Sequence, residues 1–230
     1  GLSADGTKSL LPELGIEPHG MSPFATTYLR FGPEVAAGVP ATDHVMYERG
    51  VRVTPARGAK MLARVVEPYF DRSWRHFSSH YQTPPDRPSR YAAAVHKGRV
   101  AYISYPIFSA FAQHGNVPYR LLVENILTGL LPKPILRMEA PTSTETSVMR
   151  QKSRTILHIL QYCPERRTPN LDLVEDIVPL YDVPVSLRLA KPPKRVYLAP
   201  DRTALAFKCR AGRVELRVPE VAGHAMVVFE

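Results

Sequence analysis

The sequence predicts two parts of different fold class, an α/β part over residues 1–133 and an all-β sandwich over residues 134–230. In the first part, apolar runs typical of strands are followed by two helical patterns. In the second part, short apolar runs recur every ~8–12 residues with Pro or Gly between them, as in β-sandwiches. The 23 prolines among 230 residues are about twice the usual share and favour many loops and edge strands.

The first elements of the α/β part are short and weakly patterned. Thr7–Leu14 predicts the end of a helix because Leu10, Leu11 and Leu14 share one face, and Gly15 follows as a stop signal. The candidate strands of this part are Ile16–Met21, Thr26–Phe31, Asp43–Tyr47, Val51–Val53, Met61–Val66, Tyr91–His96 and Val100–Tyr105.

The last two of these strands, Tyr91–His96 and Val100–Tyr105, are predicted to pair as a hairpin because their joint, Lys97–Gly98, is short. Two helical patterns follow, Ile107–Gln113 and Tyr119–Leu131. In the longer one leucines and isoleucine recur at helical spacing, one proline precedes it and two prolines close it. This helix therefore ends the first part.

The second part reads as short strands. Val185 and Leu187 point to one side of their run while Ser186 and Arg188 point to the other, which is the period of a strand with one buried face. One gap, Cys163–Asp182, holds a polar loop and then a short apolar stretch. The predicted strands are Thr144–Arg150, Thr155–Tyr162, Val183–Leu189, Arg195–Leu198, Ala204–Cys209, Val214–Val218 and Ala225–Phe229.

The charge distribution argues against a nucleic-acid partner. The net charge of +9 divides into +5 over residues 1–133 (15 basic, 10 acidic) and +4 over the rest (15 basic, 11 acidic). The arginines stand singly among acids and form no basic tract. No apolar run approaches the ~18 residues of a membrane span, so no membrane partner is expected.

The amino terminus and the two cysteines bear on the cellular compartment in which the protein is found. The first residues lack the basic segment and apolar stretch of a signal peptide, so a cytoplasmic location is expected. Cys163 and Cys209 form no CxxC pair and are expected to be free, buried thiols. Because the chain begins without methionine and within a helix-and-loop pattern, we expect a fragment or a processed product.

A polar, aromatic segment between Met61–Val66 and Tyr91–His96 is the main candidate site, since binding loops are usually held out by a scaffold of this kind. Its aromatic rings match the apolar faces of sugar rings, so we predict carbohydrate contacts here. A core or interface role fits the same side chains. The predicted contact residues are Trp74, His76, His80, Tyr81 and Gln82.

Metal chemistry is the first alternative for this segment. On a helix, His76 and His80 would project from one face, as in helical zinc sites. Phe77 stands where zinc hydrolases carry a glutamate, and a third ligand would have to come from afar. The sequence therefore predicts neither a metal site nor a cofactor. The candidate third ligands are Asp71, His96 and His114.

Hydrolytic chemistry is the second alternative. Ser78–His80 lacks the GxSxG elbow of a serine hydrolase. Glu67 with Asp71, or Glu13 with Glu17, could form the carboxylate pair of a glycosidase, but solvated or ion-paired acids are the simpler interpretation. No catalytic residue is therefore predicted within this chain.

Four longer stretches carry a family resemblance. They are VVEPYFDRSWRHFSSHYQTPP at 65–85, AAAVHKGRVAYISYPIF at 92–108, HILQYCPERR at 158–167 and EDIVPLYDVPVSLRL at 175–189. Together they resemble the carboxy-terminal region of bacterial glycoside hydrolases of the β-galactosidase or fucosidase kind. In those proteins a catalytic (β/α)8 barrel is followed by a trimerisation-like domain of the class I glutamine-amidotransferase, flavodoxin-like fold and then by a β-sandwich.

The resemblance implies an incomplete flavodoxin-like domain over residues 1–133 and the sandwich over residues 134–230. The barrel with its catalytic carboxylates lies outside this chain, and both cysteines lie beyond residue 133, so no amidotransferase nucleophile is expected. It implies a non-catalytic oligomerisation or accessory region whose partners are further copies and a catalytic barrel. A stand-alone carbohydrate-binding module and then a hydrolase in its own right are the alternatives.

Overall fold

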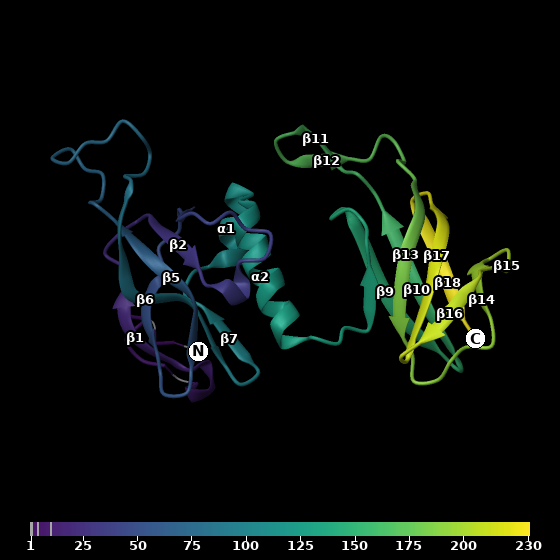
Figure 1. The fold of residues 1–230 in the computed structure, drawn as a ribbon. Coiled ribbons are helices and arrows are strands. Elements are labelled where there is room, and N and C mark those ends of the chain that lie inside the picture. Colours follow the sequence, from purple (N-terminus) through teal and green to yellow (C-terminus); the bar gives the residue numbers. More distant parts are fainter. Residues whose placement is uncertain (1, 4, 10) are drawn as a thin grey trace. The chain divides into compact units, whose positions relative to one another are not determined.

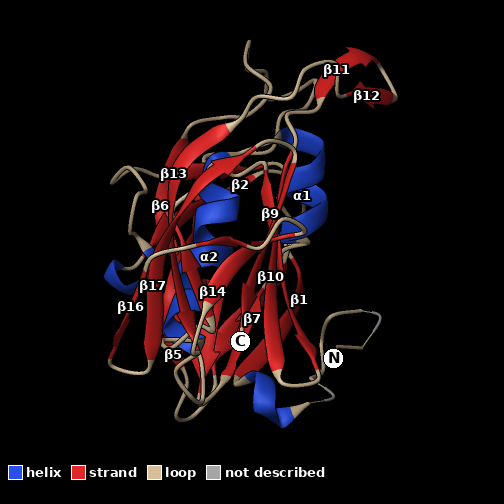
Figure 2. Cartoon of the chain, turned by 90° about the vertical axis from the view of Figure 1, so that its right-hand side faces the viewer, coloured by secondary structure: helices blue, strands red, loops and turns tan. Residues whose placement is uncertain are grey.

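The computed structural model describes residues 2–3, 5–9 and 11–230 and divides into two compact units, Gly1–Pro132 and Lys133–Glu230. Strands dominate both units, and every strand pairing between described residues is antiparallel (Figures 1 and 2). None of the described helices is both long and apolar enough to cross a membrane.

Unit 1, Gly1–Pro132, contains strands followed by two helices. The elements are η1 (Pro12–Leu14), β1 (Ile16–Met21), β2 (Thr27–Phe31), η2 (Pro33–Val35), β3 (His44–Met46), β4 (Val51–Pro55), β5 (Lys60–Pro68), β6 (Pro85–Lys97), β7 (Val100–Ile103), α1 (Ile107–His114) and α2 (Val117–Leu130). Five strands form one sheet in the order β3-β2-β5-β6-β7, and β1 pairs with β4.

The main core of unit 1 lies between the five-stranded sheet and the helices. Leu29, Leu62 and Ala93 of the sheet form one buried cluster with Ala110 of α1 and Leu122 of α2. A leucine of this kind stabilises the fold by about 1.5–3 kcal/mol through removal of its side chain from water. Leu62 of β5 and Ala93 of β6 are thus both packed against the helices, which holds these two strands in place.

The β1–β4 pair supplies a second, smaller cluster. Ile16 and Val53 from this pair are buried against Ala92 and Val95 of β6. The alanines of β6 let the pair approach closely because they carry no long side chain. Strand β6 is thus packed within the core on this side as well.

The flavodoxin-like architecture is not found in the described part of unit 1, so that expectation is corrected. A flavodoxin-like sheet is parallel and needs helical crossovers between its strands. Here a turn at Gly98 joins β6 to β7, and both helices come after the last strand. Connections of this kind return the chain directly alongside itself, which makes neighbouring strands antiparallel.

The helix predicted at Thr7–Leu14 is wrong in extent. Among the described residues of this stretch, only Pro12–Leu14 is helical, as a short 3-10 turn that Gly15 ends with φ 66°. Pro12 has no N–H for an α-helical bond and disfavours helical backbone in the preceding residue. Leu10, one of the three leucines on the predicted face, lies outside the described residues.

Unit 2, Lys133–Glu230, consists of two larger sheets and one hairpin. The strands are β8 (Leu136–Met138), β9 (Thr144–Gln151), β10 (Arg154–Gln161), β11 (Glu165–Thr168), β12 (Leu171–Leu173), β13 (Leu180–Arg188), β14 (Val196–Ala199), β15 (Thr203–Ala204), β16 (Phe207–Arg210), β17 (Arg213–Val221) and β18 (His224–Phe229). The sheets have the orders β15-β14-β18-β10-β9 and β16-β17-β13-β8, with β11 paired to β12.

The two larger sheets of unit 2 share one core. Leu157 and Val227 of the first sheet are fully buried with Leu187 and Val218 of the second. Alternate residues on β13 are buried and half-buried, as its sequence period predicted. Two sheets that bury their facing sides against each other form a sandwich, the architecture expected for this part.

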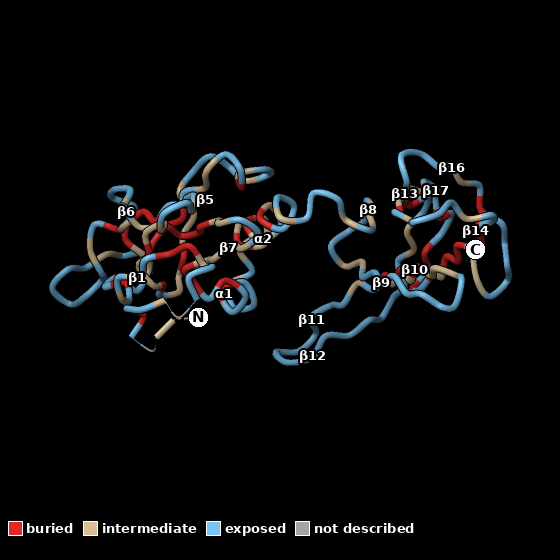
Figure 3. The backbone as a smooth tube through the Cα atoms, turned by 90° about the horizontal axis from the view of Figure 1, so that it is seen from below, coloured by how far each residue is buried: buried red, intermediate tan, exposed pale blue. Residues whose placement is uncertain are grey.

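The gap between the predicted strands contains the hairpin β11–β12, whose residues are exposed throughout. It stands out from the sheets of unit 2 and is pale blue along its length in Figure 3. Arg166 pairs with Asp172 across it, and Arg167 pairs with Glu175 at 2.7 Å. These ion pairs hold together a hairpin with no core of its own.

Both cysteines are free, but their burial differs from the expectation. Cys163 is half-buried, and Cys209 is exposed. Cys209 lies on β16, an edge strand whose last three residues all face solvent. A buried thiol was therefore the wrong prediction for this position.

Candidate functional site

The candidate site is the segment 69–84, which joins the antiparallel neighbours β5 and β6 and projects beyond the end of the sheet (Figure 1). Its base is closed by hydrogen bonds. The Thr83 hydroxyl donates to the Phe70 carbonyl at 2.8 Å, and the Tyr69 N–H donates to the Pro84 carbonyl at 3.4 Å. We call this segment the 69–84 loop.

Two contacts tie the base of the loop to β2 and the turn before it. The Tyr28 phenol donates to the carbonyl of Thr83, and burial raises the pKa of Tyr28 above its ordinary value. The Ala25 N–H donates to a carboxylate oxygen of Asp71 at 3.2 Å. The two ends of the loop are therefore fixed by the folded sheet, although the residues between them form no helix or strand.

The tip of the loop exposes large aromatic rings. Trp74 is 86% exposed, and Phe77 and Tyr81 are each 71% exposed. The Arg75 guanidinium lies 4.9 Å from the Trp74 ring centroid, and Arg72 lies 5.5 Å from that of Phe77. Apolar rings left in water in this number usually mark a surface that meets a ligand or another protein.

The structure gathers only some of the predicted contact residues. Trp74, Tyr81 and Gln82 line one hollow of about 750 Å³. His76 and His80 do not line this hollow. The ring centroid of His76 lies 5.7 Å from that of Phe70.

The metal alternative loses its geometric basis. His76 and His80 lie in irregular backbone, so their spacing of four does not place both rings on one helical face. Their backbone groups take part in loop bonds instead, since the His76 N–H donates to Ser73 Oγ and the His80 carbonyl accepts from Arg72. Among the described residues, no group of three or more His, Cys, Asp and Glu side chains is arranged to hold a metal ion.

The acidic residues near the loop are engaged in structural contacts. Glu67 at the end of β5 pairs with Arg52 of β4 at 2.7 Å, and both side chains are largely buried. Asp71 accepts the backbone bond from Ala25. Ion pairing and backbone anchoring are thus sufficient to account for both carboxylates.

An aromatic cluster fixes one flank of the tip. The Tyr81 ring lies 5.7 Å from that of Tyr47, which lies 4.8 Å from the His114 ring at the end of α1. His114 Nε2 is 3.2 Å from Glu48. Tyr81 is therefore the contact residue best positioned by neighbouring side chains, whereas Trp74 extends furthest into solvent.

Sequence reasoning missed the residues that hold the loop rather than those that form its tip. Tyr28, Thr83 and Ala25 show no local pattern, since their partners lie 13 to 55 positions away. The available signal was indirect: a tyrosine on a predicted strand needs a hydrogen-bond partner if it is buried.

No protein-family model and no curated protein sequence matches this chain. Among solved structures, the α-L-fucosidase isoenzyme 2 from Paenibacillus thiaminolyticus aligns over 97% of this chain with 32% identity and a TM-score of 0.90. The β-galactosidases from Bacillus circulans sp. alkalophilus and Rahnella sp. R3 align over 95% and 94% of the chain, each with 10% identity, at TM-scores of 0.46 and 0.47.

The α-L-fucosidase is a glycoside hydrolase, the class of enzyme that the resemblance of the sequence implied. The chain spans about a third of the fucosidase, 34% of its length, and 25% and 24% of the two β-galactosidases. The match to the fucosidase includes both units, since it omits only 3% of this chain.

Proposed function

We propose that this chain is an accessory region of a fucosidase-like glycoside hydrolase, without the carboxylates that cleave the substrate. One observation carries the proposal: almost the whole chain aligns with about a third of an α-L-fucosidase at 32% identity. The remaining two thirds of such an enzyme would supply the reaction. Further copies of the chain and a catalytic barrel are the partners that this role requires.

The 69–84 loop is the part proposed to reach a sugar. Trp74 and Tyr81 offer ring faces for the C–H face of a pyranose, and Gln82 beside them offers both a donor and an acceptor for hydroxyl groups. The hydrogen bond from the Thr83 hydroxyl to the Phe70 carbonyl keeps the base of the loop in one conformation, which lowers the entropy cost of binding. His76 and His80 are proposed as supporting contacts only.

Calorimetry on the 230-residue chain tests the loop. L-fucose glycosides and galactosides are titrated into the parent chain, a Trp74→Ala variant and a Phe108→Ala control. Phe108 is 75% exposed but lies on α1, outside the hollow. We expect binding that weakens about tenfold, or ~1.4 kcal/mol, in Trp74→Ala and is unchanged in the control.

Absence of heat with every sugar, or an equal loss in the control, would exclude direct sugar contact by the loop. The accessory role is tested separately by sedimentation at high concentration and by turnover of chromogenic glycosides. We expect self-association and no turnover. Hydrolysis by the purified chain that disappears in Glu67→Gln would contradict the proposal and favour a hydrolase.

A further inference from the structure

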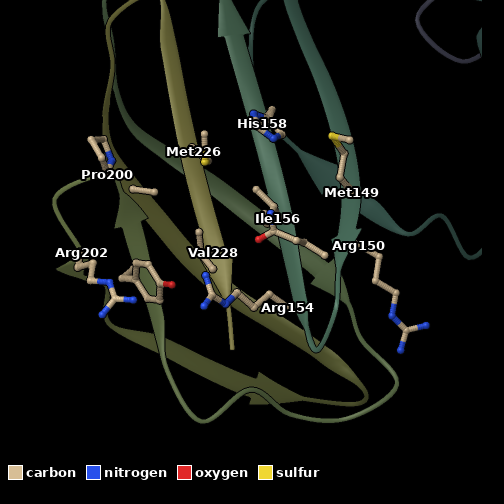
Figure 4. A pocket seen from close by; sticks show the side chains of 12 residues that line it. Met149, Arg150, Arg154, Ile156, His158, Pro200, Arg202, Met226 and Val228 are labelled. Carbon is tan, nitrogen blue, oxygen red and sulfur yellow. The ribbon is translucent and has the colours of Figure 1, made fainter.

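A second hollow, of about 540 Å³, lies on the side of the β15-β14-β18-β10-β9 sheet that faces away from the core of unit 2 (Figure 4). Strand register places an apolar row across it. Met149 pairs with Ile156, Ile156 with Val228, and Val228 with Tyr197, so one side chain from each of β9, β10, β18 and β14 forms the floor. Met226 lies in the next row of the same floor.

Arginines surround this floor. The Arg195 and Arg202 guanidinium groups lie 5.9 and 5.8 Å from the ring centroid of Tyr197. Arg154 and Arg202 line the same hollow, and Figure 4 shows both at its lower edge. Arg150 follows Met149 on β9, so its side chain points to the other side of the strand, and in Figure 4 it extends away from the floor. The two guanidinium groups cover the Tyr197 ring, which is 6% exposed, so this tyrosine holds both cations at the rim of the hollow.

The positive charge at this edge exceeds what nearby acids neutralise. Glu230 serves two arginines, Arg195 at 2.7 Å and Arg154 at 3.5 Å. Within the part of the chain that the structure describes, Arg202 forms no ion pair. An edge with one carboxylate for the three arginines Arg154, Arg195 and Arg202 favours an anionic ligand.

The polar groups that line the hollow are mostly donors. Arginine has five N–H donors and no acceptor, and none of the twelve lining residues is Asp or Glu. At the opposite end of the hollow, the His158 and His224 rings are nearly parallel, and Nδ1 of His158 lies 3.1 Å from Nε2 of His224. Nδ1 of His158 therefore already has a hydrogen-bond partner. A neutral sugar, whose hydroxyls need acceptors as well as donors, would leave many of these groups unpaired.

We propose that this hollow binds an acidic saccharide, a sugar chain carrying carboxylate groups. The apolar C–H face of a pyranose would lie on Ile156, Val228 and Met226. Carboxylates would accept paired hydrogen bonds from Arg202, which has no acidic partner, and from Arg154, which lies 3.5 Å from Glu230. This site lies in unit 2 and does not depend on the role proposed for the 69–84 loop.

A peptide fits the hollow less well. Strands β14, β18 and β10 are each paired on both sides, so among the floor strands of this sheet only the outer edge of β9, at the margin of the floor, leaves backbone groups for a peptide to pair with. The recognition elements are instead side chains, apolar at the centre and cationic at the rim. That arrangement matches a ring with an apolar face and charged substituents.

Calorimetry with tetragalacturonate tests the proposal on the whole 230-residue chain. The neutral tetramer of galactose serves as the uncharged probe, and a tetraglutamate peptide as the anionic probe that is not a sugar. We expect tetragalacturonate to bind at least tenfold more tightly than either. Arg154→Gln and Arg202→Gln should each weaken it about tenfold, the loss of one charge-assisted contact.

Arg210→Gln provides the matched control because it removes the same charge from β16, on the other sheet. It should change the affinity less than twofold. A Met149→Glu variant adds a carboxylate at an exposed floor position and should abolish binding without unfolding the chain. Methyl NMR signals of Met149 and Met226 should shift with tetragalacturonate, while that of Met21 in unit 1 should not.

Three outcomes would overturn the proposal. The first is no binding of tetragalacturonate while the methyl spectrum shows a folded chain. The second is equal affinity for one of the other probes. Equal affinity for tetraglutamate would mean general charge attraction, and equal affinity for the neutral tetramer would mean that the hollow does not select for charge. The third is an equal loss in Arg210→Gln, which would place the effect in net charge rather than in this hollow.

Discussion

At the scale of single residues, Gly50 is required by a close approach to the buried ring of Tyr105. A Cβ at this position would lie 2.5 Å from Tyr105 Cε1 and 2.8 Å from the Ser104 carbonyl oxygen. Gly50→Ala is therefore expected to destabilise unit 1 by about 1–3 kcal/mol, the usual cost of overpacking. Chemical denaturation measures the change in free energy of unfolding.

Gly129 is the matched control for this substitution. Gly129 belongs to α2, and apart from its chain neighbours and the backbone of its own helix no atom lies within 4 Å of the position that a Cβ would occupy. Gly129→Ala should leave unit 1 unchanged or stabilise it by up to ~1 kcal/mol because alanine favours the helix. Equal destabilisation by both substitutions would refute the steric explanation for Gly50.

The Tyr105 hydroxyl predicts a pH dependence of stability. It is 2.7 Å from the Thr27 hydroxyl, and burial raises its pKa from 10.0 to about 12. Because the folded pKa is higher than the unfolded one, this stabilisation is complete below pH 10 and is lost between pH 10 and 12. The full effect is about 3 kcal/mol, from ~1.4 kcal/mol per pKa unit.

Tyr105→Phe separates the two contributions of that hydroxyl. At neutral pH it should cost ~1–2 kcal/mol because the buried Thr27 hydroxyl loses its partner. Between pH 10 and 12 the variant should lose stability less steeply than the parent chain. Urea titrations at pH 7, 10 and 11.5 compare them, and parallel pH profiles would show that another group controls alkaline unfolding.

At the scale of elements, the hydrogen bond between the Thr83 hydroxyl and the Phe70 carbonyl is expected to limit the mobility of the 69–84 loop. Thr83→Val removes the hydroxyl that donates to the Phe70 carbonyl, without much change in side-chain volume. We expect a loss of ~1 kcal/mol and a lower fluorescence anisotropy of Trp74, the only tryptophan. Thr42→Val, which makes the same change at an exposed loop position, is the control. Unchanged Trp74 anisotropy in Thr83→Val would show that other contacts hold the loop.

Element types were largely predictable because they depend on local patterns. The helical spacing in Tyr119–Leu131 and the alternation in Val183–Leu189 correspond to α2 and β13. Strand β8 was missed because Leu136–Met138 is too short to show a period. The pairing of β5 with β6 across a long irregular loop depends on tertiary contacts, which no local pattern records.

For the candidate sites as well, local features could be predicted from the sequence, whereas features that depend on tertiary structure could not. An aromatic loop between two strands is visible in the sequence, and Trp74 and Tyr81 do line one hollow. The hollow on unit 2 was not found, although Ile156 and His158 alternate along one predicted strand. Its arginines come from three separate segments, and only the register of four strands brings them together.

At the scale of the whole molecule, the two units have separate cores, one containing Leu122 and the other Leu157. This predicts that each unit unfolds on its own. Leu122→Ala and Leu157→Ala should each cost about 2–5 kcal/mol, since both side chains are fully buried. In calorimetry, each substitution should lower one thermal transition and leave the other in place.

A chain of residues 133–230 extends that test because it contains the second core but none of the first. We expect it to unfold cooperatively at the temperature of the transition that Leu157→Ala lowers. The double variant should lose the sum of the two single effects, since residues with no shared partner contribute additively. A single transition that either substitution shifts would instead mean that the two cores are energetically coupled.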